Sequence, residues 1–148
     1  MFQGRKFAII AGSFDVIHPG YIQLFQQARQ QCDHLTIALQ TDPTIERPSK
    51  LKPILSYEER EQILLSIKYI DNVIKYTTEQ DLLNILRTGD YNVRILGDDY
   101  KNKYATGQEY SKEIVYLDRS HGWSTTKYKK LIAESLNGEK NDTQRSSP

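Results

Sequence analysis

The stretch Phe7-Ala8-Ile9-Ile10-Ala11-Gly12-Ser13-Phe14-Asp15-Val16-Ile17-His18-Pro19-Gly20-Tyr21 decides how this chain folds. Its first four residues are apolar, as in a buried strand, and a polar turn separates them from a helical pattern that begins at Pro19. Every helix start offers free backbone N–H groups and a partial positive charge. His18, directly before this helix, adds a positionable hydrogen-bond donor near neutral pH. The stretch therefore predicts a strand–turn–helix corner that suits a phosphate chain.

Outward from this corner, strand patterns alternate with helical patterns. Strands are expected over Lys6–Ala11, Leu35–Leu39, Val73–Tyr76, Val93–Leu96 and Glu113–Leu117, and helices over Pro19–Gln31, from Ser56 onward, Thr78–Thr88 and Ser124–Leu136. The alternation predicts an α/β fold: a Rossmann-like, doubly wound five-stranded parallel sheet with helices on both faces. Ligands of such sheets bind at the carboxyl ends of strands where the strand order reverses. We therefore expect the first and fourth strands to lie side by side in the middle.

Two of the helical segments carry an apolar stripe that we expect to face the sheet. The stripes are Ile63, Leu64, Ile67 and Ile70 in the helix from Ser56, and Tyr128, Leu131, Ile132 and Ser135 in the last helix. We predict one domain over residues 1–136. The polar, aperiodic residues 137–148 are predicted to be a disordered tail.

The composition excludes several classes of protein. Lys and Arg total 20 and Asp and Glu total 19, a formal net charge of +1, so nothing indicates a nucleic-acid binder or a polybasic membrane protein. No apolar run is long enough to span a bilayer, and the first residues lack a signal-peptide pattern. The single cysteine, Cys32, fits a reducing cytoplasm and gives no zinc-ligand pattern with three scattered histidines.

Three separated segments are suited to phosphate. The first is the corner from Gly12 to Gly20. The second, the loop from Glu46 to Pro53, is mostly basic and can close over a nucleotide. In the third, Arg119 and three successive hydroxyls at Ser124–Thr126 precede or open the last helix. Taken singly, each has a plainer explanation: an ordinary helix corner, a solvated loop and a run of capping residues.

Together these segments resemble the HxGH nucleotidylyltransferase superfamily, and within it the glycerol-3-phosphate cytidylyltransferase type. The matching motifs are Gly12-Ser13-Phe14-Asp15-x-x-His18-x-Gly20, Ser56-Tyr57-Glu58-Glu59-Arg60, Gly97-Asp98-Asp99-Tyr100 and Arg119-x-x-Gly122-x-Ser124-Thr125-Thr126. The resemblance implies that an acceptor phosphate attacks the α-phosphate of CTP and releases pyrophosphate. Because the nucleophile is already an anion, catalysis reduces to alignment and charge stabilisation.

The resemblance also implies roles for individual residues. The catalytic groups would be His18, Lys52 and Arg119. The nucleotide-binding residues would be Gly12, Ser13, Phe14, Asp15, Tyr21, Gly97, Asp98, Asp99, Ser120, Ser124, Thr125 and Thr126. The acceptor would meet Asp42, Lys50 and Arg60, and the two lysines of the loop could exchange roles. Alternatively, Arg60 is a buried ion-pair partner.

The resemblance further implies Mg²⁺ carried mainly by the CTP triphosphate, a small phosphorylated acceptor such as glycerol 3-phosphate, and a homodimer. No protein metal ligand is assigned. One departure stands out: the second histidine of the motif is Tyr21, which can donate one hydrogen bond but carries no positive charge near pH 7. Losing one oriented donor costs about 3 kcal/mol in comparable sites. Two alternatives stay open, namely an adenylyltransferase of the same fold and a non-catalytic nucleotide-binding regulatory protein.

Overall fold

The computed structural model describes residues 4–118 and 122–146, with side chains described as far as Gly138. Within this part of the chain, five strands form one parallel sheet in the order β3-β2-β1-β4-β5. The strands are β1 (Phe7–Gly12), β2 (His34–Gln40), β3 (Asn72–Tyr76), β4 (Val93–Gly97) and β5 (Glu113–Leu117). The predicted parallel sheet is confirmed, and β1 lies beside β4 as expected.

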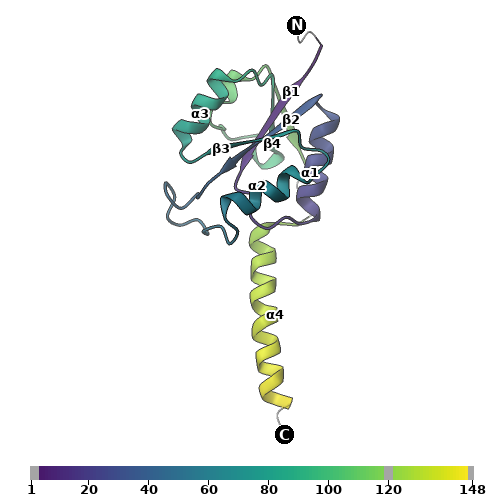
Figure 1. Ribbon diagram of the computed structural model, residues 1–148, viewed down its shortest axis with the longest axis vertical. Helices are drawn as coiled ribbons and strands as arrows, with labels where there is room; N and C mark the ends of the chain where they lie inside the picture. The colour runs from purple at the N-terminus through teal and green to yellow at the C-terminus, as the bar shows by residue number, and fades with distance from the viewer. Residues whose placement is uncertain (1–3, 119–121, 147–148) are drawn as a thin grey trace.

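Helices cover both faces of the sheet, as predicted (Figure 1). The described helices are α1 (Pro19–Gln30), α2 (Tyr57–Leu65), α3 (Glu79–Thr88) and α4 (Thr125–Ser146), with short 3₁₀ helices η1 (Asp98–Tyr100) and η2 (Gln108–Tyr110). Successive side chains of β1 point to opposite faces of the sheet and pack in both cores. Ala8 and Ile10 pack with α1 and α2, whereas Ile9 packs with Leu82 and Leu86 of α3.

The helix starts follow from local sequence. Ser56 accepts a hydrogen bond from the Glu59 N–H while the Glu59 carboxylate accepts one from the Ser56 N–H, which is the capping box that the sequence predicts. Thr78 and Asp81 form the same arrangement at α3. Caps of this kind stabilise a helix by about 1 kcal/mol. They place both helix starts at the carboxyl-terminal edge of the sheet.

The stripe predicted around α2 is only partly buried. The helix ends at Leu65, where Ser66 follows as its C-cap, so Ile67 and Ile70 lie beyond it. Leu64 and Ile70 still pack in the core, but Ile63 is exposed. The prediction that Ile63 faces the sheet is wrong, because the buried face of α2 is centred on Arg60 and Leu64 and Ile63 lies at its margin.

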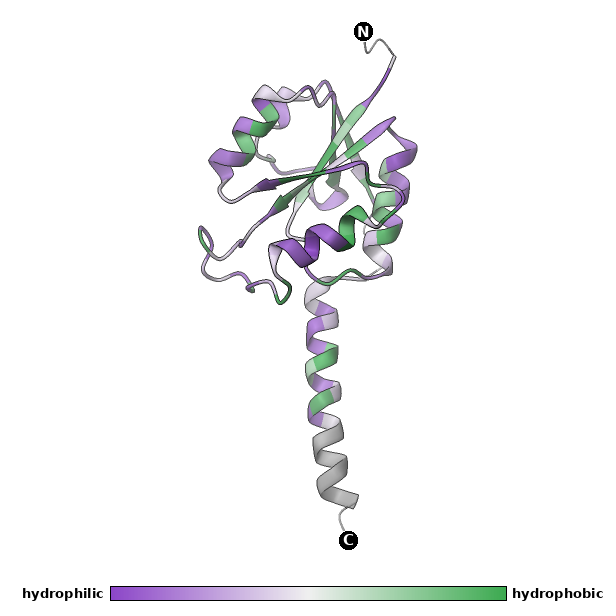
Figure 2. Ribbon diagram, in the orientation of Figure 1, coloured by the Kyte–Doolittle hydropathy of each residue, from purple (hydrophilic) through white to green (hydrophobic). Residues whose placement is uncertain are grey.

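Helix α4 differs most from expectation. It extends away from the sheet and continues to Ser146, beyond the predicted end at Leu136 (Figure 1). Residues 139–146 include Glu, Lys, Gln and Arg, which are good helix formers, so a helix there needs no apolar periodicity. Leu131 and Ile132 are 47% and 52% exposed, so the prediction that they face the sheet is wrong. Figure 2 shows hydrophobic segments on the projecting part of this helix, away from the body of the domain. Across the described residues, no helix combines the length and apolar character that a membrane span requires.

Candidate functional site

A cavity of about 730 Å³ lies at the carboxyl ends of the strands. Its walls come from the turn after β1, the loop after β2, the end of β4 and the first turn of α4. Eleven of the residues predicted to be catalytic or to bind nucleotide or acceptor line it: Gly12, Ser13, Phe14, Asp15, His18, Tyr21, Lys50, Gly97, Ser124, Thr125 and Thr126. The fold thus gathers the three phosphate-suited segments at one edge, since parallel strands end at the same edge of their sheet.

Other expected site residues lie elsewhere. Asp42, Lys52, Arg60, Asp98 and Asp99 do not line this cavity. Asp98 and Asp99 belong to η1, directly after the lining residue Gly97. Arg119 and Ser120 fall outside the described residues.

The turn after β1 depends on glycine and on an unusual backbone. Phe14 has φ +42°, and a Cβ at Gly12 would approach the Phe14 ring to 3.0 Å. The Phe14 ring is buried against Tyr21 and Phe25, with centroid distances of 5.2 and 5.5 Å. The aromatic contacts hold the turn closed, and Gly12 keeps space for the ring. Ser13 and Phe14 thereby bring main-chain atoms to the cavity wall.

His18 forms the N-cap of α1. Its Nδ1 accepts a hydrogen bond of 3.1 Å from the Gly20 N–H, so the neutral imidazole carries its proton on Nε2. The buried ring stacks between Tyr21 and Tyr128, at centroid distances of 4.1 and 5.3 Å. Capping and stacking fix the orientation of the ring in the cavity wall. Tyr128 was predicted only as a packing residue of the last helix.

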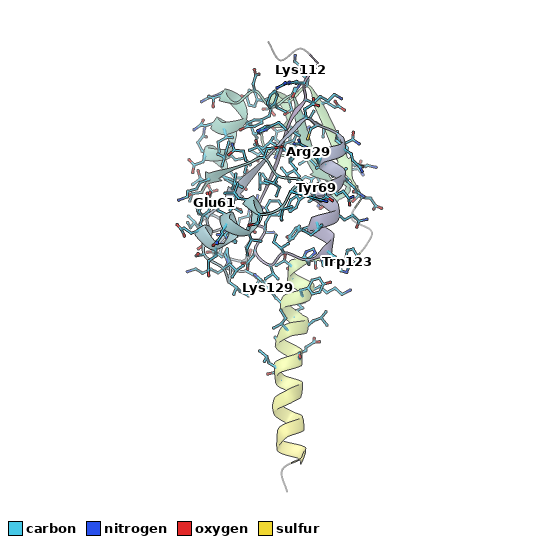
Figure 3. All side chains as sticks on the ribbon, turned by 45° about the vertical axis from the view of Figure 1, so that its right-hand side comes forward. Arg29, Glu61, Tyr69, Lys112, Trp123 and Lys129 are labelled. Carbon is cyan, nitrogen blue, oxygen red and sulfur yellow. The ribbon has the colours of Figure 1, made fainter. Side chains whose placement is uncertain are left out.

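Asp15 is buried and joins three segments. Its carboxylate accepts hydrogen bonds from the N–H groups of Ile54 and Leu55, at 2.7 and 2.9 Å, and pairs with Lys129 of α4 at 2.6 Å. Burial raises the pKa of the carboxyl, but the bond from Lys129 and the two backbone N–H groups together lower this pKa below its ordinary value. Asp15 therefore holds the end of the basic loop and the start of α4 together. Figure 3 shows Lys129 at the junction of α4 with the body.

Arg60 links several backbone segments beneath the cavity. It is 1% exposed, and its guanidinium donates to the carbonyls of Ser13, Gln40 and Thr41 at 2.6–2.8 Å. Its Nε donates to the carbonyls of Leu55 and Ser56. Burial lowers the pKa of Arg60. The acceptor contact that the resemblance implied is not what the structure places here, because backbone oxygens occupy these donors. Neither is Arg60 an ion-pair partner among the described residues.

The basic loop presents one of its two lysines to the cavity. Lys50 lines the cavity, whereas Lys52 does not and is exposed. At the start of the loop, Asp42 accepts hydrogen bonds from the hydroxyl and the N–H of Thr44, and these bonds lower the pKa of its carboxyl. Asp42 thus shapes the loop.

Several lining residues were not anticipated from the sequence, among them Tyr76, Glu79, Arg94, Tyr104, Thr106 and Lys129. Arg94 had a signal, because it is a charged residue inside the apolar run of β4. Lys129 had a weaker one, since it lies one helical turn after Thr125. The described residues contain no group of three or more His, Cys, Asp or Glu side chains placed to hold a metal ion.

Comparison with known proteins points to one family. The model of a family described as cytidylyltransferase-like matches residues 9–132. The glycerol-3-phosphate cytidylyltransferase of Bacillus subtilis is 37% identical over 128 residues, which cover 86% of this chain and 98% of that protein. The enzyme of the same name from Staphylococcus aureus is 34% identical over 127 residues, covering 86% and 95%.

Two more distant likenesses extend this result. The bifunctional protein HldE of Wolinella succinogenes is 31% identical over 134 residues, and the match covers 90% of this chain but 28% of that protein. Among solved structures, the lipopolysaccharide core biosynthesis protein of Thermoplasma volcanium superposes with a TM-score of 0.61 at 22% identity, covering 82% of this chain and all of that one. The structural likeness supports the fold alone.

Proposed function

We propose that this chain, a nucleotidylyltransferase that belongs to the cytidylyltransferase-like family, transfers CMP from CTP to a small phosphorylated acceptor such as glycerol 3-phosphate. An oxygen of the acceptor phosphate attacks the α-phosphorus, a new P–O bond forms, and the bond to the β-phosphate oxygen breaks to release pyrophosphate. The observation that carries this proposal is the single cavity that brings His18, Lys50 and the hydroxyls at the start of α4 together.

The lining residues suit a reaction that needs charge stabilisation and no protein base. The Nε2 proton of His18 would be donated to the phosphate oxygen on which charge develops. The start of α4, with the hydroxyls of Ser124 and Thr125, would hold the β- and γ-phosphates. Lys50 takes the position nearer the phosphates because it lines the cavity, and Lys52 would follow when the loop closes.

Mg²⁺ belongs to the proposal as a partner of the triphosphate. The polar groups around the described cavity are mainly cationic side chains, hydroxyls and N–H groups, few of which can ligate a metal ion. This suits an Mg²⁺ ion that keeps most of its waters and is bound by phosphate oxygens. The ion would neutralise part of the triphosphate charge. Arg119 stays in the proposal as a phosphate ligand on the basis of the motif that it shares with the family, and Ser120 stays as its neighbour in the same segment.

A homodimer is also proposed. The large apolar side chains of Leu131, Ile132 and Leu136 on α4 are 47–63% exposed. Helical spacing puts them on one face, and a second copy of the chain could cover that face.

One specific observation keeps a second function in view. Tyr21 occupies the position of the second motif histidine, and its hydroxyl oxygen is bound by Thr125. A protein that binds CTP without turning it over would tolerate this arrangement. The residues lining the cavity do not by themselves separate CTP from ATP, so an adenylyltransferase is the rival within the fold.

The deciding experiment is a pyrophosphate-release screen that crosses CTP and ATP with phosphorylated acceptors, run beside calorimetric titration of each nucleotide with Mg²⁺. The proposal expects tighter binding of CTP and release with CTP plus a phosphorylated polyol. Equal or tighter ATP binding favours the adenylyltransferase. CTP binding with no release across the screen favours the regulatory protein.

A further inference from the structure

Arg94 is a buried cation in the wall of the cavity. It is the second residue of β4 and is 3% exposed. Its neighbours Val93 and Ile95 pack in the core beneath α1 and α2, so alternation directs Arg94 to the face that α3 covers. The side chain lines the cavity there, among Tyr76 and Glu79.

No described carboxylate forms an ion pair with this charge, although the Glu79 carboxylate, which also lines the cavity, attracts it at longer range. The Arg94 guanidinium donates one hydrogen bond of 2.6 Å to the Thr106 carbonyl, and its buried Nε has no hydrogen-bond partner. No described carboxylate lies within 4.0 Å of it. Glu79 is engaged elsewhere, because one of its oxygens accepts from the Thr106 hydroxyl at 2.5 Å and the other lies 3.7 Å from Arg47. A buried charge without a counter-ion is costly, and an incoming anion would remove that cost.

The position of Arg94 indicates which part of the substrates would supply the anion. Its backbone lies three residues before Gly97, which places it roughly 10 Å below the carboxyl edge of the sheet. His18 and the start of α4, proposed for the triphosphate, lie at that edge and pack with α1. The cytosine base could accept a hydrogen bond from the guanidinium, but it is uncharged and would not supply the counter-ion that Arg94 lacks. The remaining substrate is the acceptor, whose reacting phosphate must stay near the edge.

We propose that Arg94 binds a second anionic group of the acceptor, a carboxylate or a further phosphate, at the end opposite the phosphate that attacks CTP. The inference rests on the proposed function and narrows the acceptor from any phosphorylated polyol to one with an anion at both ends. The hydroxyls of Thr106, Tyr100 and Tyr104 stand on the same part of the wall and suit the polar groups of such a molecule. Arg94 is a specificity-determining residue in this scheme.

A matched pair of probes tests the proposal. Glycerol 3-phosphate and 3-phosphoglycerate differ only in a terminal CH₂OH against a carboxylate, and glycerol 1,3-bisphosphate adds a phosphate at the same end. In calorimetric titrations of the full chain, the Kd of at least one of the two probes with an anionic group at each end should be about tenfold or more below that of glycerol 3-phosphate. This difference is the scale of one charge-assisted contact. In Arg94→Met this preference should fall to within about twofold, and Arg94→Lys should keep part of it.

Arg87→Met is the control, because Arg87 is exposed on α3, donates a hydrogen bond to Asn84 and does not line the cavity. If Arg94→Met fails to fold, Arg94→Lys and Arg94→Gln carry the comparison. The proposal is overturned if the wild-type protein does not prefer the probes with two anionic ends, or if Arg94→Met keeps that preference. Arg94 would then serve only to hold the Thr106 carbonyl in place. CTP titration of the same wild-type protein tests the proposed function separately: failure to bind CTP would reject that function while the anion preference could still be measured.

Discussion

The hydroxyl of Thr125 donates a hydrogen bond of 2.9 Å to the hydroxyl oxygen of Tyr21. The bond joins the first turn of α1 to the first turn of α4, two segments 104 residues apart. A tyrosine hydroxyl can accept one hydrogen bond and donate another, and the Thr125 hydroxyl has a second acceptor in the Val16 carbonyl, 3.3 Å away. Tyr21 is therefore placed to replace, in part, the histidine that the motif carries at this position.

Tyr21→Phe should lower kcat by more than it raises the Kd for CTP, because the hydroxyl would act mainly in the transition state. The loss expected for one neutral hydrogen bond is about 1 kcal/mol, or roughly fivefold in rate. Tyr21→His should restore the motif and raise kcat. Steady-state pyrophosphate release and CTP calorimetry measure the two effects, with Tyr110→Phe as a control on an exposed tyrosine outside the cavity. A silent Tyr21→Phe would reduce Tyr21 to a packing residue.

His18 combines two roles that two substitutions can separate. His18→Ala should remove both the cap of α1 and the proposed phosphate donor, lowering the unfolding free energy by about 1 kcal/mol and turnover by roughly 10²–10³-fold. Asn is a good N-cap but lacks the stacked ring, so His18→Asn should be more stable than His18→Ala and still lose turnover. Chemical denaturation and pyrophosphate release decide. Wild-type turnover in His18→Asn would reject the assignment of His18 to the chemistry.

Arg60 should matter for stability more than for substrate affinity. Arg60→Met would leave the carbonyls of Ser13, Gln40 and Thr41 buried without their donor, at about 1–3 kcal/mol each. We expect a loss of about 3 kcal/mol or more in unfolding free energy, against little change in Arg87→Met. A stable Arg60→Met with a raised acceptor KM would instead support the acceptor contact that the resemblance implied.

The exposed face of α4 predicts association of two chains. Sedimentation velocity should find a dimer for wild type and a monomer after Leu131→Lys combined with Leu136→Lys. Lys130→Glu, exposed on another face of the helix, is the control and should leave the dimer intact. A wild-type monomer, or a dimer that survives the double substitution, would contradict the role of this face.

The order of strands and helices could be predicted because hydrophobic periodicity and capping residues are local signals. Ser56 with Glu59 marked the start of α2, and the two special turns marked the edge where the cavity lies. The sequence could not show that Arg60 meets carbonyls 19 to 47 residues away, or that Asp15 pairs with Lys129. Those contacts exist only once the sheet brings the segments together.

The same reason explains the error at α4. A stripe such as Leu131 and Ile132 predicts a buried face, but it does not say which surface buries it. Arg94 differs, because the sequence shows a charged residue inside an apolar strand but does not show which residues surround it. Periodicity thus identifies elements, whereas the partners of a polar side chain come from topology.

The ion pair between Asp15 and Lys129 predicts a pH dependence of stability. Because the pKa of Asp15 is lower in the folded protein than its ordinary value of 3.8, the folded state binds this proton less readily than the unfolded state. The stabilisation is therefore fully present above about pH 4 and is lost as the pH falls through the folded pKa. Asp15→Asn should lower the unfolding free energy clearly at pH 7, and its difference from wild type should shrink below pH 4.

Lys129→Met removes the positive partner of the ion pair and keeps the Asp15 carboxylate. Without Lys129 the pKa of Asp15 should rise, since burial then opposes the charge with only the Ile54 and Leu55 N–H groups in its favour. The acid limb of the stability curve should therefore move to higher pH. Urea denaturation from pH 3 to pH 7 measures this, with the exposed Asp90→Asn as the control. An acid limb that Lys129→Met leaves in place would mean that the backbone N–H groups alone hold Asp15 ionised and that α4 is not anchored through its charge.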